Sequence, residues 1–252
     1  MKQKITILSL LILTLLSTLS LAQASGLSAA EIMSKIIDNQ RGGNAGRSVI
    51  TMTVIKPNKE SVFKIESISN GDEDSLIKVL EPAKDAGQAF LTAGDNLWIY
   101  NPRLRRTLRL PPSGRSDSFL GSDISYNDLG GRDQENDYDA KIIEQTDDYV
   151  VLELSPKPNA PTPYGKIVIT ADIESFAPSE YLYYDQREQA IRKIEFSNYA
   201  EIDDFFYPTH MEIIDLLKEG RKTIIDISDY DFSLEIPENC FTKQALERGC
   251  NY

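Results

Sequence analysis

The sequence predicts a mainly β fold with a few helices (α+β), built on one long antiparallel sheet that is curled or closed. From Arg47 onward, apolar and polar residues alternate with a period of two, which is typical of strands with one buried face. Clusters of Gly, Asn, Asp and Pro interrupt this alternation at short, fairly even intervals, as turns do in an antiparallel sheet. Residues 25–252 are enough chain for one domain with a full core.

Helices are expected at the start of the domain and at two later places. Ser28 and Glu31 have the spacing of a capping box, which begins a helix. The apolar residues of this helix fall on one stripe, at Ala29, Ile32, Met33, Ile36 and Ile37. The segment Arg41-Gly42-Gly43 ends it. Short helices are also predicted at residues 125–129 and 241–247.

Strands are expected wherever the alternating pattern is dense. These segments are residues 49–55, 62–68, 76–80, 89–92, 97–100, 140–144, 149–154, 166–171, 180–184, 191–196, 209–217 and 223–228. Prolines mark one irregular loop at residues 156–163. The sequence contains neither an internal repeat nor a long linker, so we expect residues 25–252 to form a single domain.

Residues 1–24 have the pattern of a cleaved secretory signal peptide. Lys2 and Lys4 precede an apolar run at residues 5–21, and Ala22-Gln23-Ala24 supplies a small-residue cleavage site. An uncleaved membrane anchor is the alternative, and it is disfavoured because the run is short and ends in a cleavage pattern. No cysteine lies near the cleavage site, which excludes a lipid anchor there. We therefore expect an exported, soluble protein.

The chain is strongly acidic, which restricts its partners. Its formal net charge is −12 at pH 7, and removal of Lys2 and Lys4 with the signal segment makes the charge more negative. Nucleic acids and anionic membranes attract basic surfaces, so this balance argues against nucleic acid and against general adhesion to such membranes.

One acidic segment loosely resembles a calcium-binding loop. Its carboxylates alternate at Asp133, Glu135, Asp137 and Asp139, and Glu144 follows eleven positions after the first. The glycine that such a loop requires is replaced by Tyr138. A solvated acidic loop is therefore favoured, and we expect no metal site.

Two cysteines, Cys240 and Cys250, lie near the C-terminus. Export places them in an oxidising compartment, which favours a disulfide. A loop this short would contribute roughly 2–3 kcal/mol by restricting the unfolded chain. Two free thiols or a metal site are the alternatives, and a metal is disfavoured because the one histidine, His210, is distant in sequence.

Residues 90–131 are the most distinctive part of the chain. They hold its only tryptophan in a W-x-Y-x-P segment at residues 98–102, followed by an arginine-rich strand at 103–109 and an SF-x-GSD stretch at 118–123. This combination resembles the signature of the LolA/LolB-like outer-membrane lipoprotein-sorting family, in its longer, transporter-associated branch. The cysteine pair is not part of that signature.

The resemblance implies an incomplete antiparallel β-barrel with helices over its mouth and an apolar interior that holds acyl chains. It also implies a periplasmic carrier, in a cell of the Gram-negative type, which shuttles a lipoprotein or lipid toward the outer membrane. Such a carrier is not an enzyme and needs no cofactor. An inner-membrane transporter of the RND or ABC type is an implied partner, and we expect a monomer.

The candidate binding residues lie in the same segment. They are Trp98, Tyr100, Arg103, Arg105, Arg106, Arg109 and Phe119. Any one aromatic residue, taken singly, is more often an ordinary core residue, so a cavity is supported by the resemblance and not by the number of aromatics.

The arginine strand has two faces if it is regular. One face would carry Arg103, Arg105, Thr107 and Arg109, and the other Arg106 with Leu104, Leu108 and Leu110. Guanidinium groups suit phosphate and carboxylate, so the basic face could hold an anionic headgroup or dock an acidic partner. These arginines could equally pair with the local acids Asp117, Asp123 and Asp128 and organise a loop.

Two other functions stay open at this point. The protein could be an accessory module that docks on an RND-type transporter and carries nothing. It could also be a hydrolase, although the sequence contains no GxSxG, no HExxH and no glycine-rich phosphate loop. Because His210 lies in a predicted strand, a structural role for it is favoured and we expect no enzyme.

Overall fold

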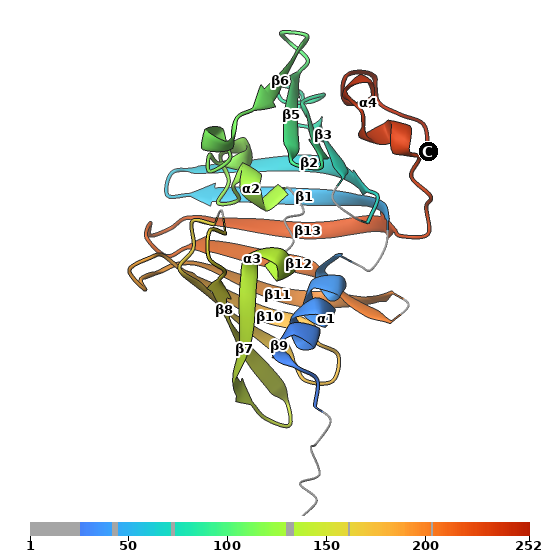
Figure 1. The fold of residues 1–252 in the computed structure, drawn as a ribbon. Coiled ribbons are helices and arrows are strands. Elements are labelled where there is room, and N and C mark those ends of the chain that lie inside the picture. Colours follow the sequence, from blue (N-terminus) through green and yellow to red (C-terminus); the bar gives the residue numbers. More distant parts are fainter. Residues whose placement is uncertain (1–25, 42–44, 72–73, 130–133, 161, 203) are drawn as a thin grey trace, which may run out of the picture.

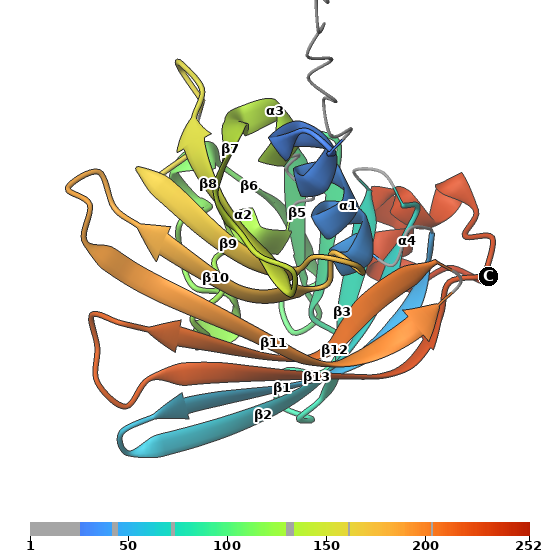
Figure 2. The same ribbon diagram turned by 90° about the horizontal axis from the view of Figure 1, so that it is seen from below.

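The fold is a curved antiparallel sheet with helices on its concave side and a C-terminal helical segment on its convex side (Figures 1 and 2). The computed structural model describes residues 26–41, 45–71, 74–129, 134–160, 162–202 and 204–252. The predicted signal segment, the glycines expected to end the first helix, and Asp133 lie outside these residues. Within the described ranges, no helix has both the length and the apolar character needed to span a membrane.

The sheet contains thirteen strands in the order β6-β5-β4-β3-β2-β1-β13-β12-β11-β10-β9-β8-β7. The strands are β1 (Gly46–Lys56), β2 (Lys59–Ser69), β3 (Ser75–Glu81), β4 (Ala89–Ala93), β5 (Asn96–Asn101), β6 (Arg106–Leu110), β7 (Tyr138–Gln145), β8 (Tyr149–Pro156), β9 (Lys166–Asp172), β10 (Pro178–Tyr184), β11 (Ala190–Ile202), β12 (Phe205–Asp215) and β13 (Lys222–Asp231). Strand neighbours in the sheet are also neighbours in sequence, except that β1 pairs with β13 and so joins the two halves.

The edge strands β6 and β7 are not paired with each other in the described part of the chain, so the sheet does not close into a barrel. The connection between them carries η1 (Pro112–Gly114), η2 (Phe119–Gly121), α2 (Tyr126–Leu129) and α3 (Gln134–Asp137). Because its two ends lie at opposite edges of the sheet, this connection crosses the opening, and Figure 2 shows α2 and α3 inside the curve. The predicted incomplete barrel with helices over its mouth is confirmed.

Helix α1 (Ala29–Arg41) lies beside α3 within the curve of the sheet. Its capping box forms as predicted, since the Ser28 N–H donates to Glu31 Oε2 at 2.7 Å and the Glu31 N–H donates to Ser28 Oγ at 3.3 Å. Four residues of the predicted stripe are buried, namely Ile32, Met33, Ile36 and Ile37. They pack against β7–β11 and hold the helix in place.

The core has three parts. One apolar cluster joins α1 to β7–β11, and a second joins β1–β5, β12 and β13 to the η2–α2 segment. A third cluster lies on the opposite face of β3–β5, because Leu91 and Leu76 belong to it while their neighbours Phe90 and Ile77 belong to the second. Among the described residues, this third cluster covers the convex face of the sheet at β3–β5.

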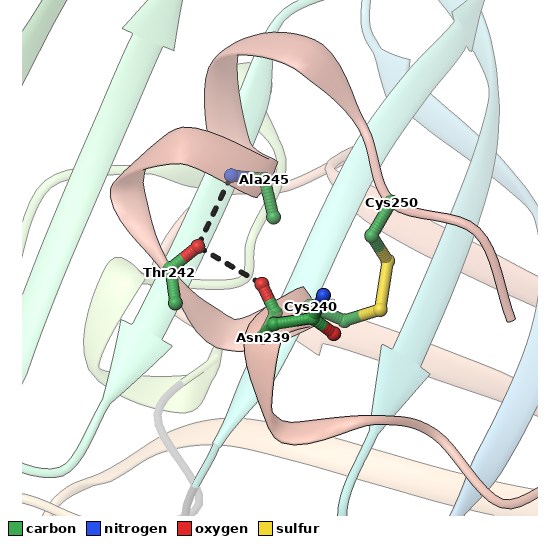
Figure 3. Close-up of a disulfide and its surroundings, with 5 residues drawn as sticks. All are labelled: Asn239, Cys240, Thr242, Ala245 and Cys250. Atoms are coloured by element: carbon green, nitrogen blue, oxygen red, sulfur yellow. Dashed lines mark hydrogen bonds between the residues drawn. A yellow bond between two sulfur atoms is a disulfide. The ribbon is translucent and has the colours of Figure 1, made fainter.

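The C-terminal segment provides this convex cover. It consists of η3 (Glu238–Phe241) and α4 (Lys243–Arg248), which pack on β3–β5. Cys240 and Cys250 form a disulfide with a Cα–Cα distance of 5.3 Å (Figure 3), as predicted. The predicted helix at 241–247 begins two residues too early, because Thr242 is the N-cap and its hydroxyl accepts from the Ala245 N–H at 3.2 Å.

Removing the disulfide should loosen the convex cover. Cys240 is fully buried, and the bond closes a loop with a sequence separation of 10. The double variant Cys240→Ala, Cys250→Ala is expected to lose about 2–3 kcal/mol of unfolding free energy, since its unfolded chain is less restricted. Urea unfolding of the oxidised parent and the variant measures the difference. Equal midpoints and slopes would show that the bond contributes nothing.

Candidate ligand-binding cavity

A cavity of about 440 Å³ lies on the concave side, where the first and second core clusters meet. Its apolar wall is formed by residues of three adjacent strands, namely Ile194, Met211, Ile213, Ile225 and Ile227. Alternation places them there, because residues two apart on a strand point to the same face. The register aligns them across strands, with Ile194 opposite Ile213 and Met211 opposite Ile225.

The other side of the cavity is formed by helices and by the β6–β7 connection. Gln40 comes from α1, and Asn127, Asp128 and Leu129 come from α2. Asp137, at the end of α3, also lines it. The helices that cross the opening of the sheet are therefore also the covering side of the cavity.

The SF-x-GSD stretch fixes this covering segment to the sheet. Asp123 accepts hydrogen bonds from Thr223 Oγ1 at 2.9 Å and from Arg221, whose Nη2 lies 2.8 Å from Oδ1. Thr223 is fully buried on β13, and its hydroxyl also accepts from the Asp123 N–H. Ser122 is buried and donates to the Phe119 carbonyl at 2.7 Å. This motif thus positions α2 over the cavity.

A partly buried ion pair joins the cover to the sheet at the cavity. Arg192 of β11 binds Asp128 of α2 through two parallel contacts, Nη1–Oδ2 at 2.9 Å and Nη2–Oδ1 at 3.1 Å. The guanidinium carbon lies 4.1 Å from the ring centroid of Tyr183 and 5.2 Å from that of Tyr164. The Arg192 side chain is 11 % exposed and that of Asp128 is 27 % exposed. The Arg192 side chain is therefore more buried than that of Asp128.

The contribution of the ion pair to folding stability is expected to depend on pH. Burial opposes ionisation of Asp128, but the Arg192 charge and the hydrogen bonds from Arg192 and Ser125 together lower its pKa below the ordinary value. A lowered folded-state pKa contributes stability above the unfolded pKa of about 3.9, and this stability is lost as pH falls through the folded value. The stability difference between wild type and Asp128→Asn should therefore be constant from pH 7 to about 5 and shrink below about 3.9. Urea unfolding across this range measures it, and a difference independent of pH would contradict the assignment.

Two polar donors at the cavity wall lack a partner within the described part of the chain. They are the hydroxyl of Tyr181, whose side chain is almost fully buried, and Nε of Arg192. Burial raises the pKa of Tyr181 well above the ordinary value, and burial raises the pKa of Tyr183 to about 12. Both phenols therefore keep their protons at neutral pH, and the Tyr181 hydroxyl is the one without a partner among the described residues.

The predicted aromatic site residues lie outside this cavity lining. Trp98 and Tyr100 belong to the convex cluster under the C-terminal segment, where Lys243 Nζ lies 3.5 Å from the Trp98 ring centroid. Phe119 lies on the concave side, where it is buried against Phe90 at 4.9 Å between ring centroids. Its role in this arrangement is to hold the segment that carries α2.

The predicted arginine residues also lie away from the cavity. Strand β6 begins at Arg106, so the prediction of a strand from Arg103 is wrong in its start. Residues 102–105 form a turn instead, because β5 and β6 are joined as a tight antiparallel hairpin with Asn101 opposite Arg106. The predicted faces hold within the strand, since Thr107 and Arg109 lie opposite Tyr100 and Trp98 on the convex side.

The alternative that these arginines pair with local acids is not supported among the described residues. Asp123 pairs with Arg221 and Asp128 pairs with Arg192. Arg103 instead donates through Nη2 to the Lys84 carbonyl at 2.5 Å. The hairpin also exposes Leu104 and Leu108, at 65 % and 61 %. This hairpin is a basic, partly apolar projection at the edge of the sheet.

The sequence did contain a signal for the ion pair. Arg192, Ile194 and Phe196 share one face of β11, so Arg192 is a charged residue on an otherwise apolar face. A cation at such a position requires a buried partner. The identity of that partner was not readable, because Asp128 is 64 positions away in sequence.

Other candidate chemistry lies elsewhere. His210 shares a face of β12 with Glu212, opposite to the cavity residues Met211 and Ile213, and its Nδ1 lies 2.7 Å from Asp226 Oδ1. Across the ranges that the structure describes, no group of three or more His, Cys, Asp or Glu side chains is placed to hold a metal ion. The acidic residues predicted to lie in a solvated loop are instead in α3, which holds Glu135 and Asp137, and at the start of β7, which holds Asp139. The strand predicted at residues 140–144 is part of β7.

Comparisons with known proteins define the family and the fold. A family model described as an uncharacterized protein matches residues 71–248. No curated protein matches the sequence. A domain from Vibrio parahaemolyticus, named for outer membrane lipoprotein sorting, superposes with a TM-score of 0.76 at 24 % identity, over 87 % of this chain and 98 % of its own.

Two further solved structures are similar. A LolA superfamily protein from Nitrosomonas europaea has a TM-score of 0.74 and 24 % identity, over 87 % of this chain and 99 % of its own. A DUF1329 family protein from Desulfovibrio piger has a TM-score of 0.78 and 23 % identity, over 86 % of this chain and 97 % of its own. At these identities the similarity establishes the fold, an open barrel of the LolA type.

Proposed function

The chain belongs to the family of uncharacterized proteins whose model matches residues 71–248, and from this family and its LolA-type fold we propose that it is a periplasmic carrier of acyl chains. The cavity on the concave side holds the acyl chain of a lipoprotein or lipid during transfer toward the outer membrane. The carrier is not an enzyme, and residues 1–24 direct its export.

The observation that carries this proposal is the apolar cavity beneath the helices of the β6–β7 connection. Isoleucine and methionine side chains of β11–β13 form one wall, and short helices of the β6–β7 connection lie opposite. Each methylene transferred from water to such a wall gains about 0.8 kcal/mol. A membrane offers the same gain, so an acyl chain can pass between membrane and cavity without ATP hydrolysis or another coupled source of energy.

Names of similar proteins support the direction of transfer. The Vibrio parahaemolyticus domain is named for outer membrane lipoprotein sorting. This chain shares that fold and has an export pattern at its start. A lipoprotein, a phospholipid or a free lipid acid would each present an acyl chain to the cavity.

Transfer between membranes tests the carrier function. Donor vesicles contain radiolabelled phospholipid, palmitate or a synthetic triacylated lipopeptide, and the protein is added and then separated from the vesicles. We expect the protein fraction to acquire at least one label at a ratio approaching one per chain, and to deliver it to acceptor vesicles. Absence of every label from the protein fraction would contradict the proposal.

The β5–β6 hairpin favours a second candidate function, that of an accessory module that docks on an RND-type transporter. Arg105, Arg106 and Arg109 are exposed there beside two exposed leucines, and none of them lines the cavity. Such a surface suits an acidic partner. Reversal of Arg105 and Arg106 to Glu should abolish partner capture and leave acyl loading intact if docking is the role. Reversal of Lys59 and Lys64, both exposed on β2, is the matched charge control.

A further inference from the structure

The cavity has a polar end, and the chemistry of this end restricts the kinds of ligand that the cavity can bind. Register places Tyr183 opposite Arg192 and Tyr181 opposite Ile194, so the two tyrosines and the arginine occupy adjacent positions on one face of β10 and β11. The Tyr181 hydroxyl and Arg192 Nε are buried, and neither has a hydrogen-bond partner in the described residues. Buried donors without acceptors are costly, so this end of the cavity is built to receive an acceptor.

We propose that the cargo is an amphiphile with one acyl chain and an anionic headgroup, a carboxylate or phosphate, that binds the Arg192 Nε–H and the Tyr181 hydroxyl. This inference rests on the proposed carrier function. The guanidinium has five N–H groups, and Asp128 engages only the Nη1 and Nη2 side. Arg192 can therefore bridge two anions, Asp128 and the headgroup.

The size of the cavity is sufficient for an acyl chain. A methylene fills roughly the 30 Å³ that a water molecule takes in the liquid. A cavity of about 440 Å³ therefore has room for at least one chain of about fifteen such groups, as in a fatty acid or a lysophospholipid.

The position of Asp128 predicts the direction in which its replacement changes ligand affinity. Its carboxylate lies on the same guanidinium and repels an anionic headgroup, so it reduces the affinity for the cargo. Replacing Asp128 by Asn removes that repulsion while keeping an acceptor for Arg192. This replacement should strengthen binding of an anion and leave binding of a neutral amphiphile much less affected.

Paired probes of equal chain length test the inference. Palmitate and hexadecanol are titrated into delipidated protein by calorimetry. The dissociation constant of hexadecanol divided by that of palmitate is the ratio compared among variants. We expect wild type to bind palmitate at least about tenfold more tightly, and Asp128→Asn to raise this ratio severalfold. Asp128→Asn combined with Arg192→Gln should bring the ratio close to one.

Tyr181→Phe provides a second variant that removes only one hydroxyl. It should lower the ratio about threefold to tenfold, whereas Tyr149→Phe, outside the cavity, should leave it at the wild-type value. Circular dichroism of each variant verifies the fold. Equal binding of both probes to wild type, or tighter one-to-one binding of a triacylated lipopeptide, overturns the inference alone. Binding of no amphiphile at all overturns the carrier function and this inference together.

Discussion

Replacing Met211 by tryptophan is expected to reduce acyl loading at least about tenfold. Met211 lies on the cavity wall opposite Ile225 of β13, and the larger indole would occupy the space of the bound chain. A tenfold loss corresponds to about 1.4 kcal/mol. The loss of only two methylene contacts, at about 0.8 kcal/mol each, is enough to produce it. The vesicle transfer assay measures the effect directly.

Ile214→Trp is the matched control for this variant. Ile214 lies on the same strand three positions later and points to the convex face, away from the cavity. It receives the same side chain and should keep wild-type loading. Equal loading by both variants would show that the acyl chain does not occupy the concave cavity.

Replacing Arg192 by methionine alone is expected to destabilise the protein by about 3 kcal/mol. The variant leaves the Asp128 carboxylate partly buried beside Tyr164 and Tyr183 with no cation to balance it. This value is at the lower end for breaking a buried pair, because Asp128 retains 27 % exposure. Urea unfolding of wild type and variant gives the difference.

The double variant Arg192→Met, Asp128→Leu separates loss of packing from loss of charge balance. Apolar side chains of similar volume often replace a buried ion pair at no cost, so we expect this variant to unfold within about 1 kcal/mol of wild type. If the double variant is destabilised as much as the single one, packing of the guanidinium against the tyrosines dominates, and the electrostatic account of the pair is wrong.

Much of the fold was predictable because local chemistry determines it. The capping box and apolar stripe predicted α1 to within a residue of its start, and alternation located every described strand except β6, which was expected from the arginine-rich segment. The bounds were less predictable where backbone pairing extends a strand beyond the core. Strand β11 continues past the predicted end at residue 196 to Ile202, because Tyr199 and Ile202 pair with Pro208 and Phe205 of β12. These partners cannot be identified from local pattern alone.

The site was less predictable than the fold. The distinctive residues 90–131 indicated the family, but several of them stabilise the fold. Asp123 accepts a hydrogen bond from Thr223 and so attaches the α2 segment to β13, and Trp98 contacts Lys243 of the C-terminal segment. The cavity wall comes from β11–β13, whose isoleucines look like any core strand in the sequence. Only the charged Arg192 on an apolar face distinguished these strands.

Native mass spectrometry tests the central claim most directly. Full-length protein is expressed with its export segment, purified from the periplasm without detergent, and weighed intact, and the lipids of the same sample are extracted and identified. The carrier account predicts a near-stoichiometric adduct that contains an acyl chain. A bare protein mass, with no uptake of added palmitate, phospholipid or lipopeptide, would contradict the account and favour the transporter-docking module.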